Sequence, residues 1–417
     1  LRLLTLDQLG RAAALICALE LEREADSATL GSWPFEIGLW VGQAATPNVM
    51  GSSSDNNEYT ALKKTLDYKA GRTDSPPIPL ENCPWCGTKF TRNSFNLHPD
   101  ANNPTNLQVI CANRACDFAG HTGRTLPILS VDEPIYRRLP CFLIATVDKF
   151  AALPWTGETG ALFGLVDRYD TEGFYGPCQP RGGQPLPNGR LPAPELIIQD
   201  ELHLISGPLG TIAGLYETAL EALCLPDAKA PRPKIIASTA TVRRAAQQIR
   251  ALFNRADADI FPPPGLDRRD SFFAETHLAT QTAPRLYVGV AAQGRSLKVV
   301  MLRTDLALMA AAQRAYEDAG GAKTIPNPAD PYLTLLGYFN SLRELGGSRR
   351  IVEDEVTSRL QNYGKRHVVN EPPGRFANRE IDFEVLELTS RVSTADVAQA
   401  KRRLEHPFSH KERVDIA

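Results

Sequence analysis

"PELIIQDELHLISG", residues 194–207, is the stretch of this chain that says most about its fold class. Its apolar run at residues 196–198 is typical of a buried strand, and Asp200 and Glu201 follow that run almost at once. Charged side chains at the end of a buried strand are unfavourable unless a partner or a metal ion takes them up. The stretch therefore predicts a strand that carries a chemical site at its carboxyl end.

The sequence after this strand alternates between helix and strand patterns. A helix is predicted over residues 210–224, a second apolar strand over 233–241 and a second helix over 242–253. This alternation indicates a parallel sheet covered by helices. Ligands of such sheets bind beyond the carboxyl ends of the strands. We therefore expect Asp200 to hold a magnesium ion that bridges nucleotide phosphates, and Glu201 to orient the attacking water.

The second strand ends in small and hydroxyl-bearing residues, Ser238, Thr239, Ala240 and Thr241. Because neighbouring parallel strands lie about 4.8 Å apart, these hydroxyls can reach His203 beside the acids. Each motif alone has a simpler explanation, since acids at a strand end can be merely solvated and Ser and Thr are common turn formers. The two motifs in this order favour a nucleotide-binding edge in which His203 relays contacts between the strands.

The bulk composition is that of a soluble globular protein, with 43% hydrophobic and 23% charged residues. A chain of 417 residues has room for two or three domains. Its 46 basic and 48 acidic residues nearly balance, so any basic surface must be local. No apolar run approaches the roughly 18 residues of a membrane span, and the N-terminal residues lack the layout of a signal peptide. We expect a cytoplasmic protein that binds no membrane.

Changes in composition predict the domain organisation. Residues 1–255 form a first lobe, which contains a cysteine-rich module at 81–121 and a Gly/Pro-rich insertion at 156–195. A breaker-rich connection follows over 256–284. Residues 285–417 start a second alternation, with strands predicted in "RLYVGV", "YLTLLGYFNS" and "FEVLELTS" and a helix behind each. The first 24 residues predict a helix whose apolar face carries Leu4, Leu9, Ala12, Leu15, Ile16 and Leu19.

The cysteine-rich module contains two closely spaced pairs, Cys83 with Cys86 and Cys111 with Cys116. Two such knuckles, 24 residues apart, supply the four thiolates that structural zinc prefers. The second pair is longer than the usual zinc-ribbon knuckle, so His98 or His121 could replace one cysteine. Two pairs of free thiols in a loop are the alternative. Zinc is favoured because clustered cysteines in a cytoplasmic protein have no disulfide to form.

The acid box and the hydroxyl-rich strand end together resemble the first RecA-like lobe of a superfamily 2 (DExH-box) helicase. More narrowly, six segments resemble the large helicase of the DISARM anti-phage system: "LRLLTLDQLGRA", "CFLIATVDKFA", "QDELHLISGPLGT", "FPPPGLDRRDSFF", "LLGYFNSLRELGG" and "LELTSRVSTADV". The resemblance runs through nearly the whole chain. It implies an α/β fold of two incomplete RecA-like parallel-sheet lobes with an inserted zinc-ribbon-like module. It also implies ATP with Mg²⁺ as cofactor, DNA as the nucleic acid, and other defence-system subunits as partners.

In such helicases the segments that resemble "LRLLTLDQ" and "ATVDKF" face the nucleic-acid backbone, as do two segments of the second lobe. The resemblance therefore implies phosphate contacts by Arg2, Gln8, Thr146, Lys149, Asn340, Ser341, Arg343, Thr389, Ser390 and Arg391. Polar surface residues at strand ends are the simpler alternative for each of them.

The chain also departs from the helicase pattern. It contains no G-x-x-x-x-G-K-[ST] motif, because "YGKR" at 363–366 lacks the first Gly and the hydroxyl. We expect the family's phosphate-binding loop to lie before Leu1 and its γ-phosphate arginines beyond Ala417. The chain is therefore interpreted as an internal piece of an ATPase that is inactive by itself. A non-catalytic nucleic-acid-binding subunit with a degenerate helicase fold, and a zinc-stabilised scaffold that docks partner proteins, are the alternatives.

Overall fold

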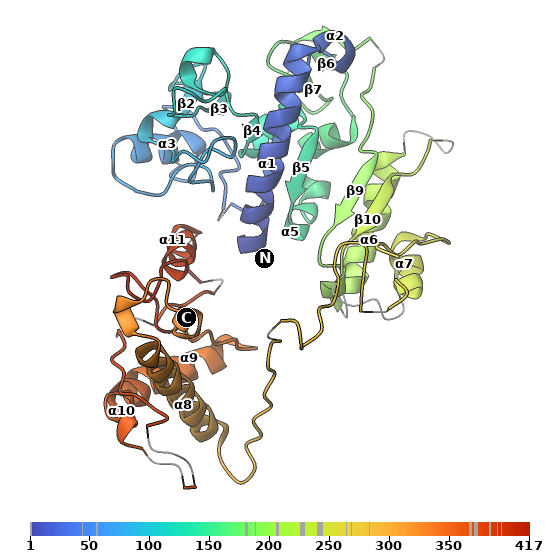
Figure 1. Cartoon of the computed structure of the whole chain (residues 1–417). Coiled ribbons are helices and arrows are strands. Elements are labelled where there is room, and N and C mark those ends of the chain that lie inside the picture. Colours follow the sequence, from blue (N-terminus) through green and yellow to red (C-terminus); the bar gives the residue numbers. More distant parts are fainter. Residues whose placement is uncertain are drawn as a thin grey trace. The chain divides into compact units, whose positions relative to one another are not determined.

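The structure is a computed structural model, and it describes two compact units, Leu1–Glu275 and Thr276–Ala417 (Figure 1). The division between the two units, after Glu275, falls within the connection expected at residues 256–284. The residues it describes are all except 1, 44, 56, 180–181, 188, 206–207, 226–229, 240–244, 264, 268, 283, 367–368, 371–373, 383–384, 390 and 393. In the part of the chain described, no helix is both long and apolar enough to cross a membrane.

The first unit mixes helices with short strands. Its helices are α1 (Arg2–Ala25), α2 (Ser27–Leu30), α3 (Ala61–Lys69), α4 (Asp132–Arg138), α5 (Val147–Phe150), α6 (Pro208–Cys224) and α7 (Ala245–Phe253). Its strands are β1 (Ile37–Trp40), β2 (Phe95–His98), β3 (Asn106–Val109), β4 (Ile128–Leu129), β5 (Phe142–Ala145), β6 (Arg168–Tyr169), β7 (Phe174–Tyr175), β8 (Gln184–Pro185), β9 (Leu196–Gln199) and β10 (Lys234–Ala237).

A three-stranded parallel sheet of order β4-β1-β5 forms the centre of this unit. Its middle strand β1 is buried along its whole length, as expected for a strand with neighbours on both edges. Gly38 allows close packing there, because a Cβ at this position would lie 2.7 Å from Pro140 and 2.8 Å from Leu143. Trp40, at the end of β1, donates a hydrogen bond of 2.8 Å to the Tyr136 hydroxyl of α4.

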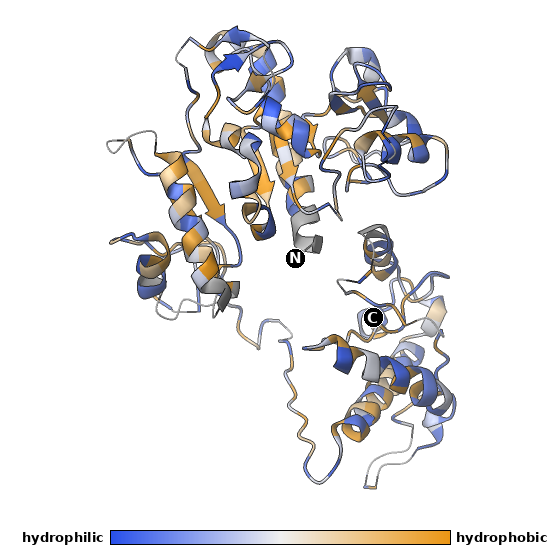
Figure 2. Cartoon of the chain, turned by 180° about the vertical axis from the view of Figure 1, so that it is seen from behind, coloured by the Kyte–Doolittle hydropathy of each residue, from blue (hydrophilic) through white to orange (hydrophobic). Residues whose placement is uncertain are grey.

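The strands β9 and β10 form a second parallel pair, in which Gln199 lies opposite Ala237. Helix α6 connects them and α7 follows β10, so the strand-helix-strand-helix order predicted around residues 194–253 is confirmed. Both strands are strongly hydrophobic (Figure 2). One face remains open, since Leu196 is 48% exposed, Ile198 55% and Ile236 46%.

The N-terminal helix α1 is confirmed, but its buried face differs from the predicted one. Leu9 and Ile16 are buried as expected, whereas Leu15 is 56% exposed and Leu19 is 41% exposed. The buried face continues from Ile16 to Glu20, whose carboxylate accepts a hydrogen bond of 2.7 Å from the arginine three residues later. A charged group satisfied in this way can be buried, and its inclusion turns the outer leucines toward solvent.

The two predicted insertions carry small antiparallel sheets. In the cysteine-rich module, β2 and β3 form a hairpin with Phe95 opposite Val109. The Gly/Pro-rich insertion at 156–195 contains a sheet of order β7-β6-β8. The module packs through Phe95 and Val109, together with residues of α1 and β1, into one hydrophobic core. The cysteine-rich module is therefore attached to the central sheet by apolar contacts as well as by the covalent chain.

The second unit is helical in the residues described, with α8 (Leu297–Asp318), α9 (Leu342–Ile351), α10 (Thr357–Leu360) and α11 (Thr394–Leu404). The helices predicted behind the apolar runs are confirmed, but the strands predicted in those runs are wrong for the residues described. The run "RLYVGV" is extended and solvated, with Tyr287 85% exposed. An apolar run forms a strand only beside a partner strand. The other two runs meet the C-terminal residues only briefly in the part described: Leu335 forms an isolated bridge with Ile416, and the Leu386 N–H donates to the Ile416 carbonyl at 3.1 Å.

A buried ion pair joins the C-terminal residues to the rest of the second unit. The guanidinium of Arg379 lies 2.7 Å from Asp415 Oδ1, and both side chains are almost fully buried. The second oxygen of Asp415 accepts the backbone N–H of Asp382 at 3.0 Å. Burial lowers the pKa of Arg379, against the effect of Asp415. The pair is therefore balanced only while Asp415 is present.

We expect Asp415→Ala to destabilise the second unit by about 3–5 kcal/mol, because it leaves a buried guanidinium without its counter-charge. Asp318→Ala is the matched control, since Asp318 and Arg314 form an exposed pair one helical turn apart, which contributes at most about 0.5 kcal/mol. Urea unfolding followed by circular dichroism measures both. Equal unfolding midpoints for the two variants would contradict the role given to Asp415.

Candidate functional site

Asp200 lies where β9 ends, and three separate segments meet at its carboxylate. Ser238, which directly follows β10, donates its hydroxyl hydrogen bond to Asp200 Oδ1. Gln8 of α1 donates its side-chain N–H to Oδ2 at 2.5 Å. The two strand ends are also joined by the backbone, since Leu202 N–H donates to the Ser238 carbonyl at 2.9 Å. The carboxyl edge of the β9–β10 pair is thus a small, interlinked polar site.

The hydrogen bonds around Asp200 favour its charged form. The Ser238 hydroxyl lowers the pKa of Asp200 most strongly, and Gln8 and the backbone N–H of Glu201 lower it further, against the effect of partial burial. Asp200 is therefore an ionised carboxylate at neutral pH. A carboxylate has about four lone-pair positions, so its two oxygens can hold these donors and still bind a cation.

Glu201 and His203 form a tight turn behind Asp200. Glu201 adopts a left-handed backbone conformation, with φ 55° and ψ 44°, which is uncommon for a residue other than Gly, Asn or Asp. Its Oε2 lies 3.2 Å from His203 Nδ1. Leu202 between them is 3% exposed and anchors the turn in the core. Strained backbone of this kind concentrates at functional sites.

The structure thus brings Asp200, Glu201, His203 and Ser238 to one strand edge. Thr239 is described at the same end of β10, whereas Ala240 and Thr241 lie outside the described residues. The contact from His203 to the hydroxyl-rich segment remains a prediction. Sequence reasoning missed the bond from Gln8 to Asp200, because the two residues are 192 positions apart and no local pattern links them.

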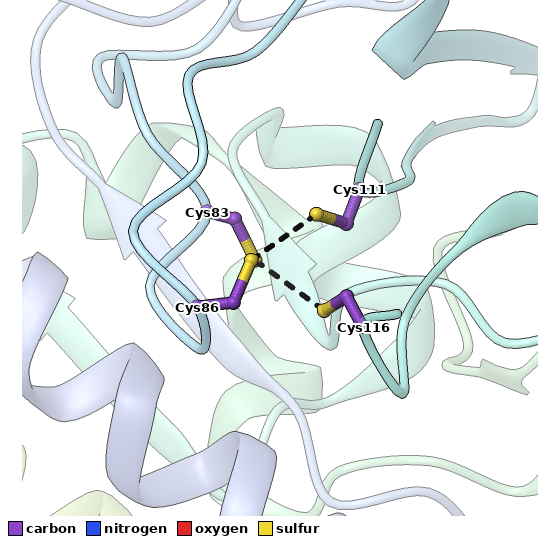
Figure 3. Close-up of side chains that lie close together, drawn as sticks. All are labelled: Cys83, Cys86, Cys111 and Cys116. Carbon is purple, nitrogen blue, oxygen red and sulfur yellow. Dashed lines mark hydrogen bonds between the residues drawn. The ribbon is translucent and has the colours of Figure 1, made fainter. Parts of the chain in front are cut away.

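The four cysteines of the module converge, as predicted (Figure 3). Their sulfur atoms all lie within 4.8 Å of one another. Cys86 Sγ is 3.4 Å from Cys111 Sγ, and Cys83 Sγ is 4.0 Å from Cys116 Sγ. In a tetrahedral zinc site with Zn–S bonds of about 2.3 Å, the sulfurs lie roughly 3.8 Å apart. The spacing of the four thiols therefore fits zinc.

The electrostatics of the cluster agree with a cation site. Burial raises the pKa of Cys83, and it raises that of Cys116 to about 11. Burial also acts on Cys86, but hydrogen bonds with Thr88 and the neighbouring thiols lower its pKa to about 6. The Cys86 thiolate is thus readily formed, while Cys83 and Cys116 need a nearby positive charge to ionise at neutral pH. A zinc ion would supply that charge.

Backbone geometry holds the first knuckle in place. Gly87 has a φ of 75°, and its N–H donates to the Cys83 carbonyl at 2.9 Å. Glycine adopts this left-handed conformation without the penalty of a side chain. His98 and His121, the predicted substitutes, are both described and are not part of the four-cysteine group. His98 instead lies 3.9 Å from Glu172.

The predicted phosphate-contact residues of the first unit have varied surroundings. The side chain of Arg2 is not described. Gln8 is bonded to Asp200, and Thr146 donates its hydroxyl hydrogen bond to Asp148 at 3.3 Å. Lys149 is 9% exposed; it donates to Asn48 at 3.1 Å and forms an ion pair with Asp132. The Lys149 ammonium would have to leave these partners to reach a phosphate.

In the second unit the corresponding residues lie near helix starts and turns. Asn340 and Arg343 are exposed, and the Ser341 hydroxyl accepts the Glu344 N–H at 3.3 Å as the N-cap of α9. Thr389 donates to Glu387 at 2.7 Å and accepts the Arg391 N–H at 3.3 Å. Ser390 lies outside the described residues. Phosphate contact by these residues remains a prediction.

A second group of metal-ligating side chains consists of His406, His410 and Glu412. The two imidazoles stack with ring centroids 3.9 Å apart. His410 Nδ1 accepts the backbone N–H of Glu412 at 3.1 Å, which places the imidazole proton on its other nitrogen. Neither nitrogen of His410 is then available to a metal without rearrangement, so the four-cysteine cluster is the better metal site.

We expect the purified chain to retain about one tightly bound zinc ion, and Cys83→Ser to lose it and loosen residues 81–121, because metal binding contributes directly to the folding of such modules. Elemental analysis and hydrogen exchange of the module measure the two effects. Cys178→Ser is the matched control, because this exposed cysteine is outside the cluster. Wild-type protein that lacks metal and still protects residues 81–121 would contradict a zinc site.

No protein-family model matches this chain. Over 424 residues it is 38% identical to the DISARM protein DrmA of Bacillus paralicheniformis, and the match covers 99% of this chain and 36% of that relative. The chain therefore spans about a third of the length of the relative. The resemblance to a DISARM protein that the motifs indicated is confirmed: along almost its whole length, this chain is related to DrmA.

Proposed function

We propose that this chain is part of an ATP-dependent nucleic-acid helicase or translocase that acts on DNA in anti-phage defence. In this proposal its two units belong to two RecA-like lobes that close over a strand when ATP binds. The observation that carries the proposal is the carboxyl edge of β9 and β10. There an ionised Asp200 is bonded to Ser238 of the neighbouring parallel strand and is followed at once by Glu201.

The edge has the groups that phosphoryl transfer to water requires. Magnesium keeps most of its waters and binds through one or two carboxylates plus substrate phosphates, and Asp200 supplies one such carboxylate. Glu201 follows on the same turn, where a second carboxylate can orient the attacking water. His203, 3.2 Å from Glu201, fixes the direction of that carboxylate. In this proposal Asp200 positions the metal and Glu201 positions the water.

The hydrogen bond between Gln8 and Asp200 supports a coupling between nucleotide hydrolysis and the binding of a nucleic-acid strand. Helix α1 includes the segment that, by resemblance, faces the nucleic-acid backbone, and Gln8 on this helix donates directly to Asp200. A movement of α1 when a nucleic-acid strand binds would change the hydrogen bonds of Asp200, the carboxylate that holds the metal in this proposal. In this way strand binding and hydrolysis can affect each other without a long chain of contacts.

The zinc module has a structural role in this proposal. Phe95 and Val109 of its hairpin share one core with Leu9 of α1 and Leu39 of β1. A zinc ion at the four cysteines would therefore stabilise the packing beside the helix that reaches Asp200. The printed name of the relative, a DISARM protein, supports the defence context and the presence of partner subunits.

The test of hydrolysis uses the full-length gene product that contains these 417 residues, because the chain itself has no phosphate-binding-loop motif. We expect Glu201→Gln to lower the ATP turnover rate by about 10²-fold or more, since it removes the carboxylate that orients water and keeps the side-chain shape. ATP affinity should remain near that of the wild type. Steady-state turnover and equilibrium nucleotide binding measure the two quantities.

Glu195→Gln is the matched control, because this exposed glutamate directly precedes β9, at the opposite end of the strand. Its turnover should equal that of the wild type. Unchanged turnover in Glu201→Gln would refute the role of Glu201. Loss of nucleotide affinity in the same variant would show that the edge binds ATP differently from the proposal.

A further inference from the structure

A cationic groove lies in the second unit, apart from every residue predicted to contact phosphate. It has a volume of about 450 Å³ and is lined by Leu306, Arg359, Asn362, Tyr363, Lys365 and Arg366. Leu306 of α8 and Tyr363 are buried and form its apolar floor. The other four side chains are exposed. The lining thus combines three cations and an amide, with no acid among these residues.

The charges of the groove are only partly neutralised. Arg359 is 2.9 Å from Glu355, which also lies 3.3 Å from Lys298. Within the described part of the chain, no acid pairs with Lys365 or Arg366. An uncompensated cluster of cations next to polar donors attracts a polyanion. The groove therefore has the charge expected of a phosphate-binding surface.

The turn that carries Lys365 and Arg366 is rigidly held. The Tyr363 ring packs edge-on against Phe376 with centroids 5.1 Å apart. Arg366 lies over the same ring and donates to the Tyr363 hydroxyl at 3.0 Å. Gly364 donates its N–H to Asn378 at 2.8 Å, and a Cβ there would lie 2.9 Å from that side chain. The cations are thus presented from a fixed backbone, which reduces the entropy lost on binding.

We propose that this groove binds the phosphodiester backbone of a single nucleic-acid strand, with Lys365 and Arg366 each neutralising one phosphate. The proposal rests on the proposed function for the type of ligand, and it assigns residues that the helicase resemblance does not include. Among its described lining residues no aromatic face is open to a base, since Tyr363 is 8% exposed. It therefore contacts phosphates and not bases, and binding through it is independent of sequence.

The test measures binding of a fluorescent single-stranded DNA to the purified chain between about 50 and 200 mM salt. Each neutralised phosphate of a single strand contributes about 0.7 to the slope of log affinity against log salt. We expect Lys365→Gln with Arg366→Gln to reduce that slope by about 1.4 and to weaken binding roughly 25-fold near 0.1 M salt. Two oligonucleotides of different sequence should be affected equally.

Two further variants separate a lost phosphate contact from other effects. Lys323→Gln with Arg314→Gln removes the same charge from exposed residues of the same unit outside the groove, and it should keep the wild-type slope. Lys365→Arg with Arg366→Lys keeps the charge and should restore most of the affinity. Thermal unfolding of each variant checks that the fold is kept, since Arg366→Gln removes a hydrogen bond to the Tyr363 hydroxyl and Arg314→Gln removes an exposed ion pair with Asp318. A midpoint near that of the wild type leaves the comparison of binding valid.

Each other outcome contradicts a different statement. Strong, salt-dependent binding by the wild type with an unchanged slope in the groove variant would overturn the groove and leave the proposed function intact. Absence of strand binding by the wild type would overturn both the groove and the nucleic-acid part of the proposed function. If inorganic pyrophosphate displaces the strand far more effectively than salt of equal ionic strength, the groove holds a soluble polyphosphate and the proposal is wrong.

Discussion

The hydrogen bond from Ser238 to Asp200 is the interaction on which the rest of the site depends. It can form only if β9 and β10 are neighbours, parallel and in the register that sets Gln199 opposite Ala237. The crossover through α6 creates that arrangement, since a parallel connection needs a long segment and usually a helix. Once the strand ends meet, Asp200 is held as an ionised carboxylate and the turn at Glu201 follows from it. The position of Asp200, its charge and the turn at Glu201 therefore all depend on the pairing of β9 with β10.

The sequence could predict the parts of this site that depend on local pattern. Apolar runs with polar ends located β9 and β10, and the helix pattern between them implied that the strands are parallel. Cysteine spacing located the four-thiol cluster, because knuckles impose their own local geometry. In both cases the information lies within a few tens of residues. That is why residues 194–253 and 81–121 have the predicted organisation.

Other features depend on contacts between distant segments, and for these the sequence was insufficient. Glu20 is buried in α1 because its carboxylate also accepts the backbone N–H of Phe35, outside the helix, at 2.7 Å, so an apolar count alone placed Leu15 and Leu19 on the wrong side. The run "RLYVGV" has strand composition, but no partner strand accompanies it in the residues described. Gln8 donates a hydrogen bond to Asp200 although 192 positions separate the two residues in the sequence. In each case the structure depends on a contact, present or absent, with a residue outside the local segment, and the local sequence pattern carries no information about that residue.

The central claim is that Asp200 holds the magnesium of a magnesium–nucleotide complex. The most direct measurement is the affinity of the full-length gene product for ATP with and without Mg²⁺, in the wild type and in Asp200→Asn, which keeps the shape and removes the charge. The account predicts that Mg²⁺ strengthens ATP binding in the wild type and has little effect in the variant, because the metal needs a carboxylate ligand as well as phosphates. An equal effect of Mg²⁺ on both proteins would contradict it.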